Sequence, residues 1–168
     1  AWADGSKLVY EAKLEGEISQ YMVSYLERVH QEAAAAGADV VLLELDTYGG
    51  YVDAAVSLKQ VIMDSEVPTY CYVNDKAISA GSLIALSCEK IAMKTGGSIG
   101  AAEPRLGDEK ADEKVVSFWT AQLTSAAESH GRDTKLAAAM SDSRVVIEGL
   151  SEAGRLLTLT SAQAVQYG

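Results

Sequence analysis

The sequence predicts a single α/β domain over residues 1–168, built around a mainly parallel sheet. Two observations lead to this prediction. Segments with the residue spacing of strands alternate along the chain with segments of helical spacing, which is the order that parallel crossover connections require. Apolar residues form 48% and charged residues 23% of the chain, as in ordinary globular domains, and no stretch has the composition of a linker.

The first part of the chain predicts a strand, a helix and a second strand. Residues 7–18 alternate apolar and polar side chains, as a half-buried strand does, and Gly16 predicts a turn. From Ser19 the apolar residues recur every three or four positions, which predicts a helix that ends at Gly37. The run 39–45 is almost entirely apolar, so we expect a strand that is covered on both faces.

The same alternation continues up to residue 93. An apolar stripe over 52–62 predicts a second helix, and Pro68 precedes a predicted strand over 69–73. We expect a third helix over 79–87 and a short strand over 90–93.

The last part of the chain begins with a charged segment, 104–113, which lacks an apolar period and predicts a mobile surface loop. A long amphipathic helix is expected after it, ending near Gly131. Its apolar face consists of Val115, Val116, Trp119, Leu123, Ala126 and Ala127. The remaining expected elements are a helix over 134–140, a β-like segment over 145–147, a strand over 156–159 and a closing helix.

Charge and residue spacing argue against several kinds of partner. With 14 basic and 24 acidic residues the formal net charge is −10, so a nucleic acid partner is not expected. Cys71 and Cys88 lack the spacing of a metal site, as do His30 and His130, and we expect neither a metal nor a cofactor. The two cysteines are predicted to be small buried residues, although a disulfide between them stays open outside the cytosol.

The carboxyl ends of two predicted strands carry residues suited to acyl transfer. The first is the segment 46–50, where Gly49 and Gly50 would let the backbone approach a substrate and aim an N–H at a developing oxyanion. A tight strand-to-helix turn is the alternative interpretation. The second is the segment 77–81, where small neighbours would expose the hydroxyl of Ser79 while the Ala80 N–H points to the same side. Ser79 could instead be an N-cap serine.

A nucleophilic serine needs a base, and neither histidine is placed to serve as one. A lysine is therefore the expected base. Burial lowers the pKa of a lysine and leaves part of it as free amine. The candidates are Lys76, Lys90, Lys94, Lys110 and Lys114. Lys114 combines apolar neighbours with the charged loop before it, although a solvated lysine in the first helical turn is the alternative. The glycine-rich segment 96–100 lacks the residues of a phosphate-binding loop and predicts a turn beside the substrate groove.

Three stretches of the chain resemble one known family. They are LELDTYGGYVDAA, VPTYCYVNDKAISAGSLIALSCEKIAMKTGGSIGAAEP and the stretch from Lys114 to Asp133, and the closing GRLLTLTSAQAVQYG is also similar. The family is that of the ClpP-class membrane-bound serine proteases, in particular the N-terminal protease domain of NfeD proteins. The resemblance implies a ClpP/crotonase-like fold of repeated ββα units with one curved sheet.

The resemblance also implies a catalytic dyad of serine and lysine. Ser79 matches the nucleophile and Lys114 the general base, while Gly49 and the Ala80 N–H match the oxyanion hole. An apolar peptide is expected to lie along a strand edge at Gly50, Tyr51 and Val52.

The chain departs from the family pattern at two positions beside this site. Tyr48 stands where the family usually has proline, which frees an N–H and adds bulk at the groove. Ile78 stands where the family usually has alanine, and its branched side chain stiffens the residue before Ser79.

Relatives in this family cut apolar segments of stomatin-like membrane partners and form homodimers, so both are expected here. The resemblance further implies a signal segment before the domain and membrane spans after it. The protein would then be membrane-anchored through segments absent from this chain, with its domain outside the cytoplasm. The start Ala1–Ala3 fits the tail of a processed signal peptide, although an ordinary chain start is an equal alternative.

Two other functions are compatible with the residues. The domain could keep the fold without the chemistry and serve as a binding or scaffolding module for a membrane partner, with Lys114 far from Ser79. An acyl-CoA enzyme of the crotonase type could use the same backbone oxyanion hole, but the net charge of −10 leaves little room for a basic patch that binds the CoA phosphates.

Overall fold

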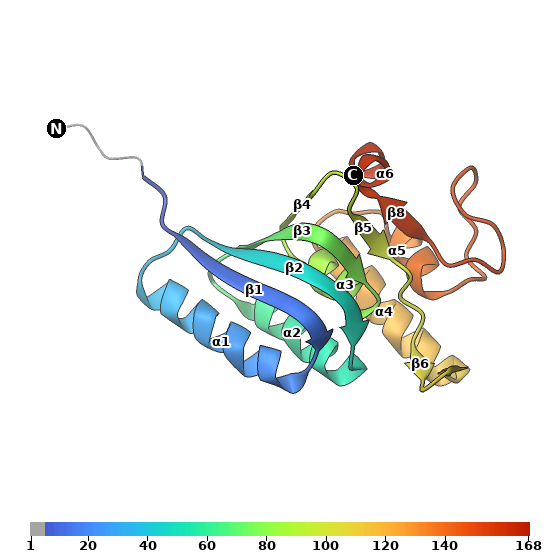
Figure 1. Cartoon of the computed structure of the whole chain (residues 1–168), viewed down its shortest axis with the longest axis horizontal. Helices are drawn as coiled ribbons and strands as arrows, with labels where there is room; N and C mark the ends of the chain where they lie inside the picture. The colour runs from blue at the N-terminus through green and yellow to red at the C-terminus, as the bar shows by residue number, and fades with distance from the viewer. Residues whose placement is uncertain (1–5) are drawn as a thin grey trace.

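The computed structural model describes residues 6–168, so the start Ala1–Ala3 lies outside the described residues (Figure 1). A sheet with helices along it forms most of the molecule. In chain order the elements are β1 (Val9–Ile18), α1 (Gln20–Ala35), β2 (Val40–Gly50), α2 (Val52–Asp64), β3 (Thr69–Ile78), α3 (Ala80–Ser87), β4 (Lys90–Met93), β5 (Ser98–Gly100), β6 (Arg105–Leu106), β7 (Glu109–Lys110), α4 (Glu113–Ser129), α5 (Thr134–Ser141), β8 (Thr158–Thr160) and α6 (Ser161–Tyr167).

The main sheet of the described residues has the strand order β1-β2-β3-β5-β8, with β4 also paired to β3. Every pair is parallel except β5 with β8, which confirms the prediction of a mainly parallel α/β sheet. Two strands share one edge of β3. β4 pairs with its first half, where Cys71 lies opposite Ile91, and β5 pairs with its second half, where Ala77 lies opposite Ile99.

The core lies between the sheet and the helices α1 to α4, which pack on one face of the sheet. In Figure 1 α1 and α2 run along the same side of β1, β2 and β3, and α3 contacts both β2 and β3. The side chains of Val41, Leu43 and Leu45 are fully buried toward the helices. Leu42 and Glu44 between them are only half-buried, so the prediction of a strand covered on both faces is wrong. The second face is shielded only by neighbouring strand residues, such as Tyr70 opposite Leu42.

Several predicted boundaries are wrong because strands run further than their apolar residues. β2 continues to Gly50 and β3 to Ile78, so both end directly at the segments that carry the candidate site. Gly16 is not a turn. It lies inside β1, at a shift in the β1–β2 register, with a φ of 86° that suits glycine.

Three segments differ from the prediction in kind. The charged segment 104–113 contains a small antiparallel hairpin, β6–β7, whose turn holds Gly107 at a φ of 61°. The glycine-rich segment 96–100 ends in β5 rather than forming only a turn. In the predicted β-like segment only Ile147 makes a bridge, to Ser151. Only β5 depends on pairings with residues distant in sequence, in β3 and β8, and a short periodic pattern cannot report such pairings.

Candidate active site

Ser79 connects the end of β3 to the start of α3 in a conformation that is rare for a residue with a side chain. Its φ is 56° and its ψ is −120°. It occupies the N-cap position of α3, yet its hydroxyl accepts no hydrogen bond from the first turn of that helix, so the structure does not support an N-cap role for the side chain. Sharp strand-to-helix turns of this kind present nucleophilic serines in hydrolases.

Gly49 lies against Ser79. Its φ is 116°, and a Cβ built at this glycine would stand 2.7 Å from Ser79 Cβ, 3.1 Å from Ser79 Oγ and 3.3 Å from the backbone N of Ala80. No side chain fits in this space, because a Cβ contact below 3.0 Å forces atoms to move. The fold therefore brings together three of the predicted site residues, Gly49, Ser79 and Ala80, from two neighbouring strand ends.

The N–H of Gly49 already has a partner in this structure. It donates to Oγ1 of Thr47, at a distance of 2.9 Å between N and O. A substrate oxyanion would therefore have to share or replace this hydrogen bond. The role of Gly49 in an oxyanion hole stays a prediction.

Ser82 fixes the backbone around Ser79, a function that the sequence reasoning missed. Its hydroxyl is buried, lies 2.9 Å from the carbonyl oxygen of Ala77 and accepts from Gly100 N at 3.0 Å. The backbone N–H of Ser79 in turn donates to the Gly100 carbonyl at 3.0 Å. The sequence does contain a signal, since Ser82 is a polar residue inside the otherwise apolar first turns of α3.

Lys114 does not lie in the apolar setting that was predicted for it. It is exposed in the first turn of α4, whereas Val115 is half-buried and Val116 is buried against the core. The helical rotation between successive positions directs Lys114 to the solvent side. Within the described part of the chain its ammonium group makes no hydrogen bond to the hydroxyl of Ser79, and its role as the general base stays a prediction.

Two of the other candidate bases, Lys76 and Lys110, form ion pairs with carboxylates. The ammonium of Lys76 lies 2.7 Å from a carboxylate oxygen of Asp46 and 2.7 Å from one of Asp75. Hydrogen bonds to these carboxylates, Asp46 foremost, raise the pKa of Lys76 well above its usual value, so Lys76 stays protonated. Lys110 pairs with Glu103 at 2.8 Å. Lys76 is therefore a poor general base.

Tyr48 does not lie at the groove, and the predicted peptide-binding segment Gly50–Val52 is not all strand. The ammonium nitrogen of Lys76 lies 4.6 Å from the centroid of the Tyr48 ring. Tyr48 is on the face of β2 opposite to the one where Gly49 contacts Ser79. Gly50 is exposed and Tyr51 is 58% exposed. Val52, however, begins α2, and Tyr51 N already donates to the Ile18 carbonyl at 3.0 Å. The strand edge predicted over Gly50–Val52 therefore ends at Gly50.

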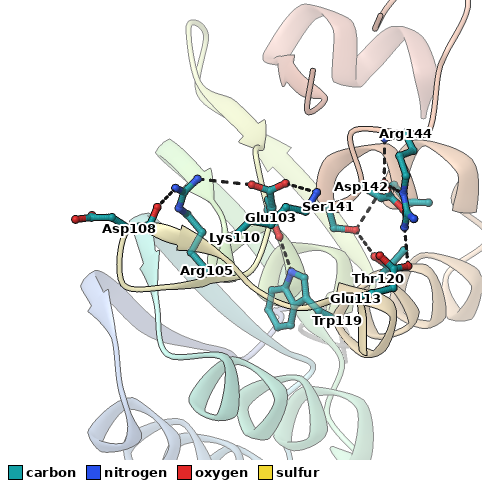
Figure 2. A network of polar contacts seen from close by, with 12 residues as sticks. Glu103, Arg105, Asp108, Lys110, Glu113, Trp119, Thr120, Ser141, Asp142 and Arg144 are labelled. Atoms are coloured by element: carbon teal, nitrogen blue, oxygen red, sulfur yellow. Dashed lines mark hydrogen bonds and ion pairs between the residues drawn. The ribbon is translucent and has the colours of Figure 1, made fainter. Parts of the chain in front are cut away.

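A polar network holds the start of α4, where Lys114 lies (Figure 2). Arg144 pairs with Glu113 at 2.8 Å and with Asp142 at 2.7 Å. The hydrogen bond from Arg144 lowers the pKa of Asp142 to about 2. Further along α4, Trp119 Nε1 donates to the carbonyl oxygen of Ala102 at 2.6 Å. These contacts connect α4 to the end of α5 and to the segment that follows β5.

The described residues include both cysteines, and neither forms a disulfide. Cys71 and Cys88 are both buried and both carry free thiols. No three His, Cys, Asp or Glu residues in the range 6–168 are grouped so that they could hold a metal ion. None of the helices in this range has both the length and the apolar character needed to span a membrane.

Comparisons with known sequences give one family. The family model described as "NfeD1b, N-terminal domain" matches residues 8–168. Membrane protein NfeD1b of Bacillus subtilis is 38% identical over 162 residues, which cover 95% of this chain and 37% of the relative. Membrane-bound protease PH1510 of Pyrococcus horikoshii is 33% identical over 170 residues, covering 96% of this chain and 36% of the relative. The chain thus spans little more than a third of the length of these relatives.

Solved structures show the same relationship. The 1510-N membrane-bound stomatin-specific protease, as a serine-to-alanine mutant, superposes with a TM-score of 0.84 at 30% identity and covers 98% of this chain and 78% of that one. A lysine-to-alanine mutant of the same protease, in complex with a substrate peptide, gives a TM-score of 0.85 at 31% identity. It covers 98% of this chain and 74% of that one. ClpP1 from Listeria monocytogenes superposes with a TM-score of 0.70 at 16% identity and covers 94% of this chain and 86% of that one. This similarity supports the ClpP-like fold alone.

Proposed function

This chain belongs to the family of NfeD1b N-terminal domains, and from that premise we propose that it is a serine endopeptidase. The observation that carries the proposal is the position of Ser79. Its hydroxyl caps no N–H of α3, its backbone is held in a strained conformation, and both Gly49 and the Ala80 amide lie beside it. This is the arrangement that an activated nucleophile next to an oxyanion site requires.

In the proposed reaction Ser79 is the nucleophile and Lys114 is the general base. The Ser79 oxygen forms a bond to the carbonyl carbon of the substrate while its proton moves to the Lys114 amine. The amides of Gly49 and Ala80 donate hydrogen bonds to the oxyanion of the tetrahedral intermediate. The C–N bond then breaks, the leaving amine takes the proton from Lys114, and water hydrolyses the acyl-enzyme. The named mutants of the relative, one serine and one lysine each changed to alanine, support these two roles.

The arrangement of α4 places a requirement on this mechanism. Lys114 is exposed and makes no hydrogen bond to Ser79 within the described residues, so the start of α4 has to move toward Ser79 when a substrate binds. The ion pair of Arg144 with Glu113 joins α4 to this network, and both of its side chains are exposed, so its net energy is low and it can break in such a step.

We further propose apolar peptide segments of a stomatin-like membrane protein as the substrate. The relative whose structure was solved is named as specific for a stomatin, and Gly50 and Tyr51 leave exposed backbone and an exposed ring next to Gly49. We also propose that the protein acts as a homodimer. We propose that it is anchored to a membrane through segments beyond this chain, with this domain outside the cytoplasm. The membrane-protein names of the relatives support the membrane anchoring.

A scaffolding domain without catalysis is the second candidate, and the exposed position of Lys114 is the observation that favours it. Cleavage of a fluorogenic apolar peptide separates the two functions. We expect Ser79→Ala and Lys114→Ala to abolish cleavage, since they remove the nucleophile and the base. Lys135→Ala is the matched control, because Lys135 is also the second residue of an exposed first helical turn, in α5, and it should cleave at the wild-type rate. Unchanged turnover in Ser79→Ala would refute the protease.

A further inference from the structure

Thr47 lies where the regular pairing of β2 is interrupted on both sides. In the β1–β2 ladder the register shifts between Glu15 and Glu17, and in the β2–β3 ladder it shifts between Leu45 and Thr47. Thr47 itself is 1% exposed. Backbone groups near such irregularities cannot all be satisfied by the ladder, so they need side-chain partners.

The hydroxyl of Thr47 supplies these partners. Oγ1 accepts from the N–H of Gly49 at 2.9 Å and donates to the carbonyl oxygen of Gly16, in the irregular part of β1. One hydroxyl therefore connects the end of β2 to its neighbouring strand and sets the direction of the Gly49 N–H.

The methyl group of Thr47 contacts the other half of the candidate site. A Cβ built at Gly81, two residues after Ser79, would stand 2.6 Å from Thr47 Cγ2. Its next neighbours are at ordinary contact distances, namely Ala77 Cβ at 3.6 Å and the Thr47 carbonyl oxygen at 3.7 Å. Thr47 is thus in contact with the first turn of α3 through its methyl group and with Gly49 through its hydroxyl.

We propose that Thr47 is a positioning residue, which sets the spacing and orientation of the Gly49 amide relative to Ser79 and Ala80. The inference rests on the proposed protease function and deepens it. Thr47 touches no substrate atom in this role, and it acts through Gly49 and Gly81. The hydroxyl and the methyl group contribute separately, and each can be removed by one conservative substitution.

The first test compares Thr47→Val with Thr47→Ser in the 168-residue chain, using a fluorophosphonate that reacts with activated serines. Valine keeps the shape and removes the hydroxyl, so we expect the maximal rate of Ser79 labelling to fall about tenfold or more while the concentration for half-maximal rate changes little. Serine keeps the hydroxyl and should restore most of that rate. Equal rates in wild type and Thr47→Val would overturn the proposal.

A second test does not depend on whether Thr47→Val folds. In Gly81→Ala the new Cβ is forced against Thr47 Cγ2, so labelling should slow. In the double variant Thr47→Ser/Gly81→Ala that methyl group is gone, so the rate should return toward that of Thr47→Ser alone. Additive effects of the two substitutions would contradict the contact.

Hydrogen exchange at the Gly49 amide separates failure of this inference from failure of the proposed function. We expect strong protection in the wild type and in Thr47→Ser, and loss of protection in Thr47→Val. If the wild type is never labelled at Ser79, the protease function is refuted, and exchange still decides whether Thr47 orients the Gly49 amide. Protection that is unchanged in Thr47→Val would show that it does not.

Discussion

Ser79 illustrates how a single residue in this fold holds conformational strain at a chemically useful place. A positive φ at a residue other than glycine costs on the order of 1–3 kcal/mol, and it persists only where surrounding contacts determine it. Here the Ser79 N–H is fixed by Gly100, and its carbonyl accepts from Ser82 N at 2.9 Å. The strain exposes the hydroxyl on the side where Gly49 leaves room for it.

Substitution of Gly49 should separate stability from activity. In Gly49→Ala the Cβ collides with Ser79, so we expect phosphonate labelling of Ser79 to be lost. Gly37→Ala is the matched control. It also places a side chain at positive φ, 67°, but with no atom within 4 Å, so it should cost about 1 kcal/mol of unfolding free energy and leave labelling intact. Labelling at the wild-type rate in a folded Gly49→Ala would contradict this view of the site.

Only part of this site could be predicted at the level of residues. The closeness of Gly49, Ser79 and Ala80 follows from the rule that carboxyl ends of parallel strands meet, together with the small residues at both ends. The bonding partners of Thr47 and Ser82 could not be predicted, because their hydroxyls bond to backbone groups of Gly16 and Gly100, whose proximity depends on the strand register. Lys114 lies outside the apolar stripe of α4, so the apolar residues that follow it in sequence do not give it an apolar setting.

At the scale of elements, a buried histidine joins α1, α2 and β3. His30 is 6% exposed, with Nδ1 2.7 Å from the hydroxyl of Ser65 and Nε2 3.1 Å from the hydroxyl of Thr69. Ser65 follows α2 and Thr69 begins β3. Burial lowers the pKa of His30 below its usual value near 6.5, because the charged form loses its hydration there.

This histidine should make the stability depend on pH. Above about pH 7 His30 is neutral in both folded and unfolded chains, so it does not make the free energy of unfolding depend on pH. As the pH falls through 6.5, the unfolded chain binds a proton that the folded chain resists, so the free energy of unfolding decreases. Urea unfolding between pH 8 and pH 5 should show this decrease in the wild type, and a smaller one in His30→Gln. An equal decrease in both proteins would assign the effect to other groups.

The elements themselves could be predicted wherever burial on one face produced a clear period. α1, α2 and α4 follow from their apolar stripes, and β3 follows in part from the residues after Pro68. The final residues of β2 and β3 could not be predicted, since Gly49, Gly50 and Lys76 have low strand propensity and are extended because neighbouring strands pair with them.

In the molecule as a whole, the helices α1 to α4 cover one face of the sheet, and the core lies on that side (Figure 1). Cys71 and Cys88 both belong to that core, with exposed fractions of 1% and 0%. Burial raises the pKa of the Cys88 thiol well above its usual value, so it is scarcely ionised at neutral pH.

The two thiols should therefore react only when the molecule unfolds. We expect iodoacetamide at pH 8 to modify neither cysteine in the native chain, and both in urea without a reducing agent, as measured by intact mass. Modification of neither cysteine in urea would show a disulfide between them and contradict the free thiols seen here.

Mapping of a fluorophosphonate adduct by mass spectrometry tests directly whether Ser79 is an activated nucleophile. We expect a single adduct on the peptide that contains Ser79, lost in Ser79→Ala and after denaturation. It should be retained in Ser129→Ala, which removes an exposed serine at the end of α4. Absence of an adduct from the folded wild-type chain, or an adduct on another serine with Ser79 unmodified, would contradict this expectation.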